Sequence, residues 1–349
     1  MSQQYTILFG GSSFEHEISV ISAITLKKVL EGKQIGFIFV SADREFYKIP
    51  ADKMKSNHFS SGAYKKDAKL GLANGGFTTS GLFGSKRVDT GTIINLIHGG
   101  DGEDGKIAGM LTFYKIPFIG PRLEAFAVSF NKELTKMYAQ AVGVKMLDYQ
   151  VIRRGEEAGI RFDFPIILKP ARLGSSIGVS IVKEASELDY ALDVAFEFDT
   201  DIVVEPFVAG VHEYNLAGCF TSEWNYSIIE NPQKEEFLDF DKKYLDFNRS
   251  EKPQDADLPE KTAEAMRDAF RKIYGTRFAG SLIRCDFFVI DDEVYLNEIN
   301  PIPGSMANYL FADFTATMDA LSRSLPKEQH IHIDYLYINK IQSSKGKVR

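Results

Sequence analysis

The chain has 349 residues, of which 44% are hydrophobic and 26% charged, and its formal net charge is −7. This length predicts two or three domains with an ample core, and the negative charge disfavours a general nucleic-acid role. No apolar run approaches the roughly 18 residues of a membrane span, and the first residues lead into a strand without a signal-peptide pattern. Cys219 and Cys285 stand far apart, which argues against a disulfide framework and fits a reducing cytoplasm.

Strand-like and helix-like segments alternate from the N-terminus onward, which predicts an α/β fold. We expect strands over the following segments: 5–9, 35–40, 93–97, 117–120, 164–170, 179–183, 202–208 and the part of the chain near 213–230. Helices are expected from about Ile18 to Leu30 and over 131–142, 186–197 and 258–275. Residues 50–90 are polar and rich in glycine, which indicates an elaborated loop region. The segment 233–256 is long and polar, which is typical of a disordered loop or a functional lid.

The sequence RCDFFVIDDEVYLNEINP, which begins at Arg284, predicts a hairpin of two strands with an acidic turn. Side chains alternate between the faces of a strand, so Arg284 and Asp286 share one face, as do Glu298 and Asn300. A three-residue turn of sequence DDE would place Asp286 opposite Glu298. Oxygen ligands of this kind suit Mg²⁺, and a salt-bridge ladder on a solvated face of the hairpin is an equally weighted interpretation.

The segment HGGDGEDGKIAG begins at His98 and has the glycine and lysine spacing of a P-loop, but Ile107 stands where a Mg²⁺-binding hydroxyl belongs. Its acidic residues would also repel phosphates, so we exclude a P-loop NTPase. The plain interpretation is a loop that leads into a helix over 106–114. Because α/β folds bind ligands beyond the carboxyl ends of their strands, His98 remains a candidate substrate residue.

The segment GGSSFE follows the first strand and opens the first helix. Ser12 and Glu15 have the spacing of a capping box, which would give both residues a purely structural role. The alternative is that Glu15 lies at the rim of a pocket and receives a substrate ammonium group. A dinucleotide fingerprint is not supported, because the segment lacks the GxGxxG pattern.

Lys169 stands at the end of a predicted strand and precedes a glycine-serine loop that contains Ser175 and Ser176. Such a loop can bind phosphates through backbone N–H groups and the ammonium group, whereas the plain interpretation is a turn with a surface lysine. Lys132, near the start of a helix, is either a second phosphate lysine or a solvated one. Glu205 ends an apolar strand, where a buried carboxylate needs a partner.

Together these segments resemble the D-alanine–D-alanine ligase family of the ATP-grasp superfamily, over nearly the whole chain. The similarity is carried, in order, by GGSSFEHEISV, HGGDGEDGKIAGML, KPARLGSSIGVS, VVEPFVAG, DKKYLD and RCDFFV…LNEINPIPGSM. The resemblance implies a Rossmann-like parallel-sheet domain with the first-substrate site (1–121), a central ATP-grasp domain (122–205), and a C-terminal ATP-grasp domain with the metal site and lid (206–349). It implies that ATP is held between the last two domains. It also implies ligation of two D-alanine molecules through a D-alanyl phosphate, for peptidoglycan precursor synthesis.

The resemblance further implies roles for individual residues. Those that would bind ATP are Lys132, Lys169, Ser176, Glu205, Glu213 and Lys243, and those that would bind two Mg²⁺ ions, with Mn²⁺ as an alternative, are Asp286, Glu298 and Asn300. Arg284 and the backbone of Gly304 would stabilise the oxyanion of the tetrahedral intermediate. Glu15 would bind the ammonium group of the first D-alanine and form a hydrogen-bonded trio with Ser175 and Tyr244 that closes the lid. His98 and Tyr309 would contact the substrates.

Three positions depart from the family pattern: Asn131, Leu173 and Tyr309 stand where relatives often have aspartate, glutamate and serine. The leading interpretation is a cytoplasmic ligase that acts on small molecules, without nucleic-acid or membrane partners, and the family suggests a homodimer. Two alternatives stay open. One is a D-alanine–D-lactate ligase, and the other is a nucleotide-binding ATP-grasp protein without ligase activity.

Overall fold

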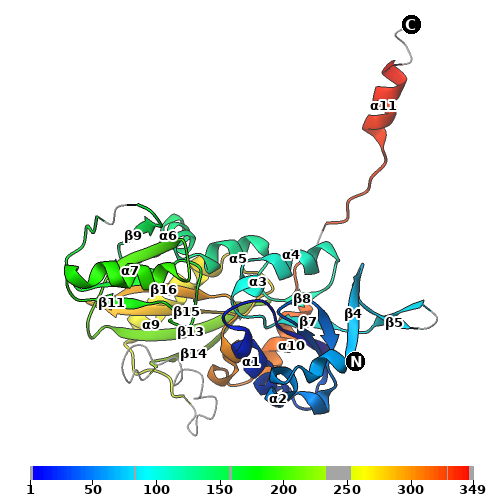
Figure 1. Ribbon diagram of the computed structural model, residues 1–349, viewed down its shortest axis with the longest axis horizontal. Helices are drawn as coiled ribbons and strands as arrows, with labels where there is room; N and C mark the ends of the chain where they lie inside the picture. Colours follow the sequence, from blue (N-terminus) through cyan, green and yellow to red (C-terminus); the bar gives the residue numbers. More distant parts are fainter. Residues whose placement is uncertain (1–2, 82–83, 157–158, 233–252, 328, 346–349) are drawn as a thin grey trace.

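Three β-sheets organise the chain in the computed structural model, which describes residues 3–81, 84–156, 159–232, 253–327 and 329–345 (Figure 1). The first sheet has eight strands in the order β6-β5-β4-β3-β2-β1-β7-β8. Its parallel half consists of β1 (Gln4–Gly10), β2 (Gln34–Val40), β7 (Thr92–Asn95) and β8 (Phe118–Ile119). The sequence predicted all four, because strands of a parallel sheet that are buried on both faces are short apolar runs.

The other half of this sheet is antiparallel and consists of β3 (Phe46–Lys48), β4 (Ala68–Ala73), β5 (Gly76–Gly81) and β6 (Gly84–Val88). The expectation of a loop region over 50–90 is therefore wrong, and a parallel sheet describes one half only. The strands β5 and β6 are rich in Gly, Ser and Thr, and in β3 and β4 the buried Tyr47 and Leu70 stand among exposed or partly exposed residues. The apolar alternation that identifies a half-buried strand is therefore weak here. The Asn74-Gly75 pair between β4 and β5 is the signal that favours a hairpin here.

Helices surround the first sheet: α1 (His16–Val29), the short α2 (Ser56–Ser60) and α3 (Gly100–Glu103), α4 (Lys106–Phe113) and α5 (Leu123–Phe130). The apolar residues of α1 recur at helical spacing and are buried against the sheet. Two serines, Ser19 and Ser22, are buried on this same face of α1 and are fully inaccessible. A buried hydroxyl needs a hydrogen-bond partner. Both serines have such partners in segments outside α1.

The second and third sheets each have four antiparallel strands. The second has the order β11-β10-β12-β9, and its elements are β9 (Gln150–Arg153), β10 (Ile166–Pro170), β11 (Ser180–Val182), β12 (Asp201–Pro206) and α7 (Leu188–Phe196). The helix α6 (Lys132–Ala141) precedes these strands and packs against α5 and β16. The third has the order β14-β13-β15-β16, and its elements are β13 (His212–Phe220), β14 (Trp224–Glu230), β15 (Ile283–Ile290), β16 (Glu293–Asn300) and α9 (Glu260–Tyr274). Most of these were predicted within a few residues, and β9 was not.

The hairpin β15–β16 has the predicted pairing near its end but a different turn. Asp286 lies opposite Glu298 and Arg284 opposite Asn300, as expected, whereas Ile290 pairs directly with Glu293. The turn therefore has two residues instead of three, and both have positive φ, 49° and 62°. The register shifts once between Asp286 and Phe287, where β16 has an additional residue. A β-bulge of this kind restores the pairing that the shorter turn would otherwise have changed.

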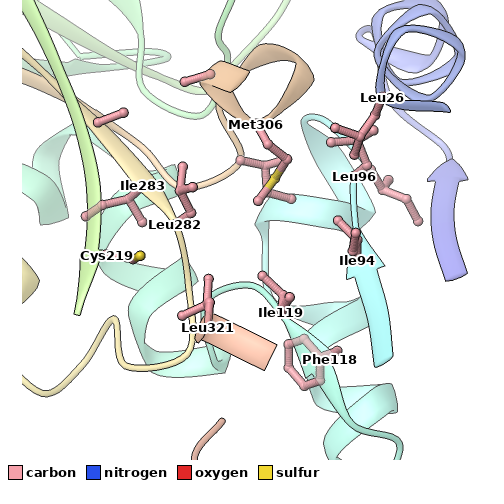
Figure 2. Packing of buried hydrophobic residues seen from close by; sticks show 14 of the residues in the cluster. Leu26, Ile94, Leu96, Phe118, Ile119, Cys219, Leu282, Ile283, Met306 and Leu321 are labelled. Atoms are coloured by element: carbon pink, nitrogen blue, oxygen red, sulfur yellow. The ribbon is translucent and has the colours of Figure 1, made fainter. Parts of the chain in front are cut away.

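The first and third sheets share one hydrophobic core. Figure 2 shows Leu26 of α1 and Leu96 near Met306, with Leu282, Ile283 and Cys219 on the other side. The second sheet has a separate, smaller core of nine buried residues that includes Ile166 and Val204. Both cysteines are buried in the shared core as free thiols, and burial raises the pKa of Cys219 to about 12. The proposed boundaries at 121 and 205 stay predictions.

The chain returns to the first sheet at its C-terminal end. The helix α10 (Phe314–Arg323) packs there, where Asp319 accepts a hydrogen bond of 2.7 Å from the buried Tyr5 hydroxyl. The last helix, α11 (Leu336–Lys345), lies away from the body of the molecule (Figure 1). In the described part of the chain, none of the helices has the length and apolar character that crossing a membrane requires.

Candidate functional site

A carboxylate held by two lysines lies at the centre of the second sheet. Glu205, on β12, is 2% exposed and forms ion pairs with Lys169 of β10, at 2.5 Å, and with Lys136 of α6. Burial alone would raise the pKa of Glu205, but the two ammonium groups lower it to about 2. Glu205 thus has the partners that its buried position requires, and it is ionised at neutral pH.

Lys169 also connects the second sheet to the third. Its ammonium group donates a hydrogen bond of 3.2 Å to Oδ1 of Asn297, the additional residue of the β16 bulge. Burial would lower the pKa of Lys169, but the Glu205 carboxylate outweighs this effect and raises it. Lys169 is therefore a charged group between the two sheets, and the plain interpretation of a solvated surface lysine is wrong.

Lys132 begins α6 and points into the same region. Its ammonium group donates to the carbonyl oxygens of Pro170, at 3.2 Å, and Leu173, at 2.5 Å. Burial lowers the pKa of Lys132, while the Glu298 carboxylate opposes this effect. Asn131 caps the helix, because its side chain accepts from the N–H of Glu133 at 2.9 Å. An aspartate there would do the same, so this departure from the family pattern preserves the cap.

Glu15 meets Ser175 across the first and second sheets. The Ser175 hydroxyl donates to the Glu15 carboxylate, which is only 7% exposed. Burial raises the pKa of Glu15, although Ser175 and the charge of Lys132 act in the opposite direction. The capping-box interpretation is wrong: α1 begins at His16, and no side chain caps it. Two of the three members of the predicted trio are therefore in contact, while Tyr244 and Lys243 lie outside the described residues.

The polar face of the β15–β16 hairpin forms a closed network. Arg284 donates two hydrogen bonds to Asp286, at 2.7 and 2.8 Å, and the Asn300 amide donates a third at 3.0 Å. Burial raises the pKa of Asp286 to about 6, even though Arg284 lowers it. Asp286 is 2% exposed, so the interpretation of a solvated salt-bridge ladder is wrong. Arg284 itself has a raised pKa: burial opposes this shift and Asp286 causes it.

A pocket gathers side chains from all three parts of the chain. Its lining includes Lys132, Lys136, Lys169, Glu205, Asn297, Glu298 and Asn300, together with Glu103, Leu173 and Gly174. A second pocket lies beside it and is lined by Glu15, Phe14, Leu173 and Phe198, among others. The predicted phosphate lysines and two of the predicted metal ligands therefore line one cavity, and the predicted ammonium-binding residue lines the next.

Other predicted site residues lie outside the two linings. Glu213, on β13, faces Phe288 in the strand pairing, and its charge acts on both Lys169 and Asp286. The Tyr309 hydroxyl donates to Glu230 at 3.5 Å. Ser176 follows Ser175 with the same left-handed backbone, at φ 59° and 58°. Their roles stay predictions.

Gly304 and His98 are absent from both pocket linings, and the hydroxyl of Ser22 lies between His98 and the residue after Gly304. Gly304 begins a short 3-10 segment, and the three residues that follow it, 305–307, have φ values of 48°, 56° and 49°. Each left-handed residue other than glycine costs roughly 1–2 kcal/mol. His98 is 4% exposed, and its Nε2 lies 3.2 Å from the hydroxyl of Ser22. Burial lowers the pKa of His98 to about 4, so the ring is neutral at neutral pH.

Sequence reasoning missed three residues of the site. Lys136 was recognisable, because it follows Lys132 by one helical turn and so lies on the same face of α6. Asn297 was not, because its contact with Lys169 depends on the bulge. Glu103 lines the first pocket, and burial together with the charge of Glu15 raises its pKa well above that of an ordinary glutamate. It was read only as an acidic residue of a loop.

Two family models and several known proteins match this chain. A family model described as "D-ala D-ala ligase N-terminus" matches residues 4–121, and one described as "D-ala D-ala ligase C-terminus" matches residues 138–320. The D-alanine–D-alanine ligases of Sulfurovum sp. and Wolinella succinogenes are each 59% identical, over 98% of this chain and 99% of theirs. The crystal structure of the Helicobacter pylori D-alanine–D-alanine ligase superposes with a TM-score of 0.85 at 46% identity, over 94% of this chain and 100% of that one. The chain therefore belongs to the D-alanine–D-alanine ligase family.

Proposed function

We propose that this protein joins two D-alanine molecules at the expense of ATP and releases D-alanyl-D-alanine, ADP and phosphate. The carboxylate of the first D-alanine attacks the γ-phosphorus of ATP, the bond from this phosphorus to the bridging oxygen of ADP breaks, and D-alanyl phosphate and ADP are formed. The amine of the second D-alanine then attacks the acyl carbon, the C–O bond to phosphate breaks, and the amine loses a proton. One observation carries the proposal: a pocket lined by Lys132, Lys169 and Glu298 adjoins a pocket lined by Glu15.

The lysines suit phosphate groups, because ammonium groups act as point charges on ground and transition states alike. Lys136 and Lys169 both form ion pairs with the single carboxylate of Glu205. This group of three side chains therefore keeps a positive charge that the negative charge of a polyphosphate can balance. Glu15 suits an ammonium group, since Ser175 orients its carboxylate and Lys132 and Glu298 lie near enough to influence its charge. Phosphate and amino-acid groups would then be neighbours, as acyl phosphate formation requires.

The donor set also fits a divalent cation. Among the described residues, no three His, Cys, Asp or Glu side chains are gathered closely enough to hold a metal by themselves. Asp286, Glu298 and Asn300 instead offer hard oxygen atoms, which is how Mg²⁺ is held when substrate phosphates complete its shell. Asp286 receives three hydrogen bonds and keeps one of its four lone-pair sites. Bound Mg²⁺ would neutralise phosphate charge during transfer.

Arg284 and the backbone N–H of Gly304 are proposed to stabilise the oxyanion that forms when the amine attacks. The proposal also includes the following features: two metal ions, Lys243 and Tyr244 in a lid, His98 and Tyr309 as substrate contacts, a homodimer and a cytoplasmic location. Two free, buried cysteines fit a reducing compartment.

Product analysis tests the proposal. The purified protein is incubated with ATP, Mg²⁺ and D-alanine, with and without D-lactate, and products are identified by mass spectrometry. Phosphate release that depends on D-alanine and yields the dipeptide is the expected result. A depsipeptide formed in preference to the dipeptide would favour the D-lactate alternative. ATP binding without any ligated product would reject ligase activity.

A further inference from the structure

A buried serine of α1 is joined to the segment that carries Gly304. The backbone N–H of Ser305, the residue next to Gly304, donates a hydrogen bond of 3.2 Å to the hydroxyl of Ser22. Ser22 is fully buried and Ser305 is 3% exposed, so water cannot substitute for this contact. Nothing in the sequence singled out Ser22, because it stands on the apolar face of a helix.

The same hydroxyl meets the ring of His98. Nε2 of His98 lies 3.2 Å from the Ser22 hydroxyl oxygen. A neutral imidazole has one donor and one acceptor nitrogen, so Ser22 can accept from Ser305 and donate its own proton to His98. Burial keeps the pKa of His98 low, and its interaction with the backbone of Ile302, two residues before Gly304, acts in the opposite direction.

The segment that these contacts hold is strained. Residues 305–307 have left-handed φ angles although none of them is glycine, and such a run persists only where the surroundings enforce it. The backbone N–H of Met306 bonds to Pro303 at 2.7 Å within the segment itself. Contacts from outside come from Ser22 on one side of Gly304 and His98 on the other.

We infer that Ser22 and His98 are positioning residues that fix the backbone of Gly304, and so orient the N–H group that meets the oxyanion in the condensation step. This inference rests on the proposed function and deepens it. Neither residue needs to touch a substrate for this role. For His98, this action through the backbone of 302–305 would come in addition to the substrate contact proposed above.

The test compares Ser22→Ala with Ser19→Ala. Both serines are fully buried on the same face of α1, but the Ser19 hydroxyl contacts Gly10 and Leu96 and not the segment 302–305. Loss of one hydrogen bond predicts that Ser22→Ala lowers kcat about 2- to 10-fold at unchanged KM for ATP. Ser19→Ala should lose comparable thermal stability without this fall in kcat.

A phosphinate analogue of the dipeptide separates positioning from general destabilisation. Its tetrahedral phosphorus imitates the intermediate, so its affinity should follow transition-state stabilisation. Ser22→Ala should weaken its binding by the same factor as kcat/KM, and Ser19→Ala should leave it unchanged. Equal effects of the two variants on kcat and on analogue affinity would overturn the inference.

His98 is tested by two replacements of similar size. His98→Gln has an amide that can reach Ser22, whereas His98→Leu has none, so the glutamine variant should retain several-fold more activity. Equal losses would overturn the part assigned to His98.

Hydrogen exchange keeps the inference distinct from the proposed function. The Ser305 amide should exchange faster in Ser22→Ala than in the parent or in Ser19→Ala, whatever the reaction catalysed. Absence of D-alanine-dependent phosphate release in the parent would reject the proposed function alone, and unchanged Ser305 exchange would reject the inference alone.

Discussion

Glu205 is a single buried carboxylate that compensates the charge of two lysines in the pocket. Two lysines from different elements converge on it, and all three side chains are largely withdrawn from water. Removing the carboxylate that both lysines contact leaves two buried ammonium groups without their ion-pair partner, which is more costly than removing one of the cations.

Glu205→Gln should therefore destabilise the fold by about 3–5 kcal/mol at pH 7, the usual cost of breaking a buried ion pair. Lys136→Met should cost less than half as much, because Glu205 keeps Lys169. Urea unfolding followed by circular dichroism measures both. A Lys136→Met variant that is the less stable of the two would contradict this account of the charges.

Glu298→Gln should fold normally and lose turnover. The substitution keeps shape while it removes one charge from a pocket that is expected to hold metal-bound ATP, so kcat should fall at least about tenfold. Steady-state kinetics at saturating Mg²⁺, with a thermal melt as the control for folding, provide the measurement. Unchanged kcat would remove Glu298 from the metal site.

His98 predicts a particular dependence of stability on pH. Burial lowers the pKa of His98 from 6.5 in the unfolded chain to about 4 in the folded one. The unfolded state therefore binds the proton more tightly, so stability is lost as pH falls from 6.5 towards 4. This single group would contribute about 3 kcal/mol to the loss. Glu103, with Oε1 3.8 Å from Nδ1 of His98, is an acidic neighbour of this ring.

The comparison of parent and His98→Gln isolates this contribution. Unfolding free energies measured at pH 7, 6, 5 and 4 should fall more steeply in the parent, since glutamine does not titrate. Parallel curves for the two proteins would show that His98 is accessible to protons in the folded state.

Among the elements, the β15–β16 hairpin explains what the sequence could and could not predict. Alternation of side chains correctly placed Asp286 and Glu298 on one face, because this depends only on strand geometry. The turn was predicted with one residue too many and the bulge was not foreseen, and these two errors cancelled. Bulges depend on tertiary contacts, here between Asn297 and Lys169, which no local pattern encodes.

The same distinction applies to the other elements. The buried strands β1, β2 and β7 were predictable from their apolar runs, whereas β4 to β6 are largely polar apart from the buried Leu70 and Phe77, and so resemble loops. Within the site, Lys132 and Lys169 were found through motif order, and Glu103 was missed because its burial follows from packing of distant segments. Ser22 was missed for a related reason, since its partner Ser305 is 283 residues away.

The turn of this hairpin offers a test at the level of the element. Asp292 has a φ of 62°, a conformation that glycine adopts at little cost, and its side chain is exposed. Asp292→Gly would complete the Asp-Gly pair that favours a two-residue turn, and it would remove the cost of a left-handed residue other than glycine. This gain exceeds the added entropy of the unfolded chain, so the protein should become more stable by about 0.5–1 kcal/mol. Thermal unfolding measures the gain, with exposed Asp257→Gly as a control outside the turn. A lower melting temperature than the parent's would contradict the turn assignment.

At the scale of the whole molecule, the two separate cores predict that the second sheet unfolds locally at a lower free energy than the other two sheets. The first and third sheets share one large core, and the second sheet has its own small one. A unit with few buried apolar residues opens at lower free energy than the rest. Amides of β10 and α7 should therefore exchange with solvent faster than those of β1 and β13 in native-state hydrogen exchange.

ATP should protect the second sheet in particular. A nucleotide held by Lys169 on β10 and Glu298 on β16 would bind only while the second sheet is folded. It would therefore raise the free energy of local unfolding of this sheet. Hydrogen exchange with and without ATP and Mg²⁺ measures this change. Uniform protection across all three sheets, or exchange of β1 as fast as that of β10, would contradict an independent second unit.

The burial of Cys219 and Cys285 has a practical consequence. Only thiolates react with maleimides, and burial raises the pKa of both thiols far above neutral pH. The folded protein should therefore not react with maleimides, and neither native cysteine needs to be replaced. A cysteine introduced at exposed Tyr190 on α7, and another at exposed Phe113 on α4, would accept a pair of fluorophores selectively. Single-molecule energy transfer between them would then report the distance between α7 and α4 with and without ATP and D-alanine.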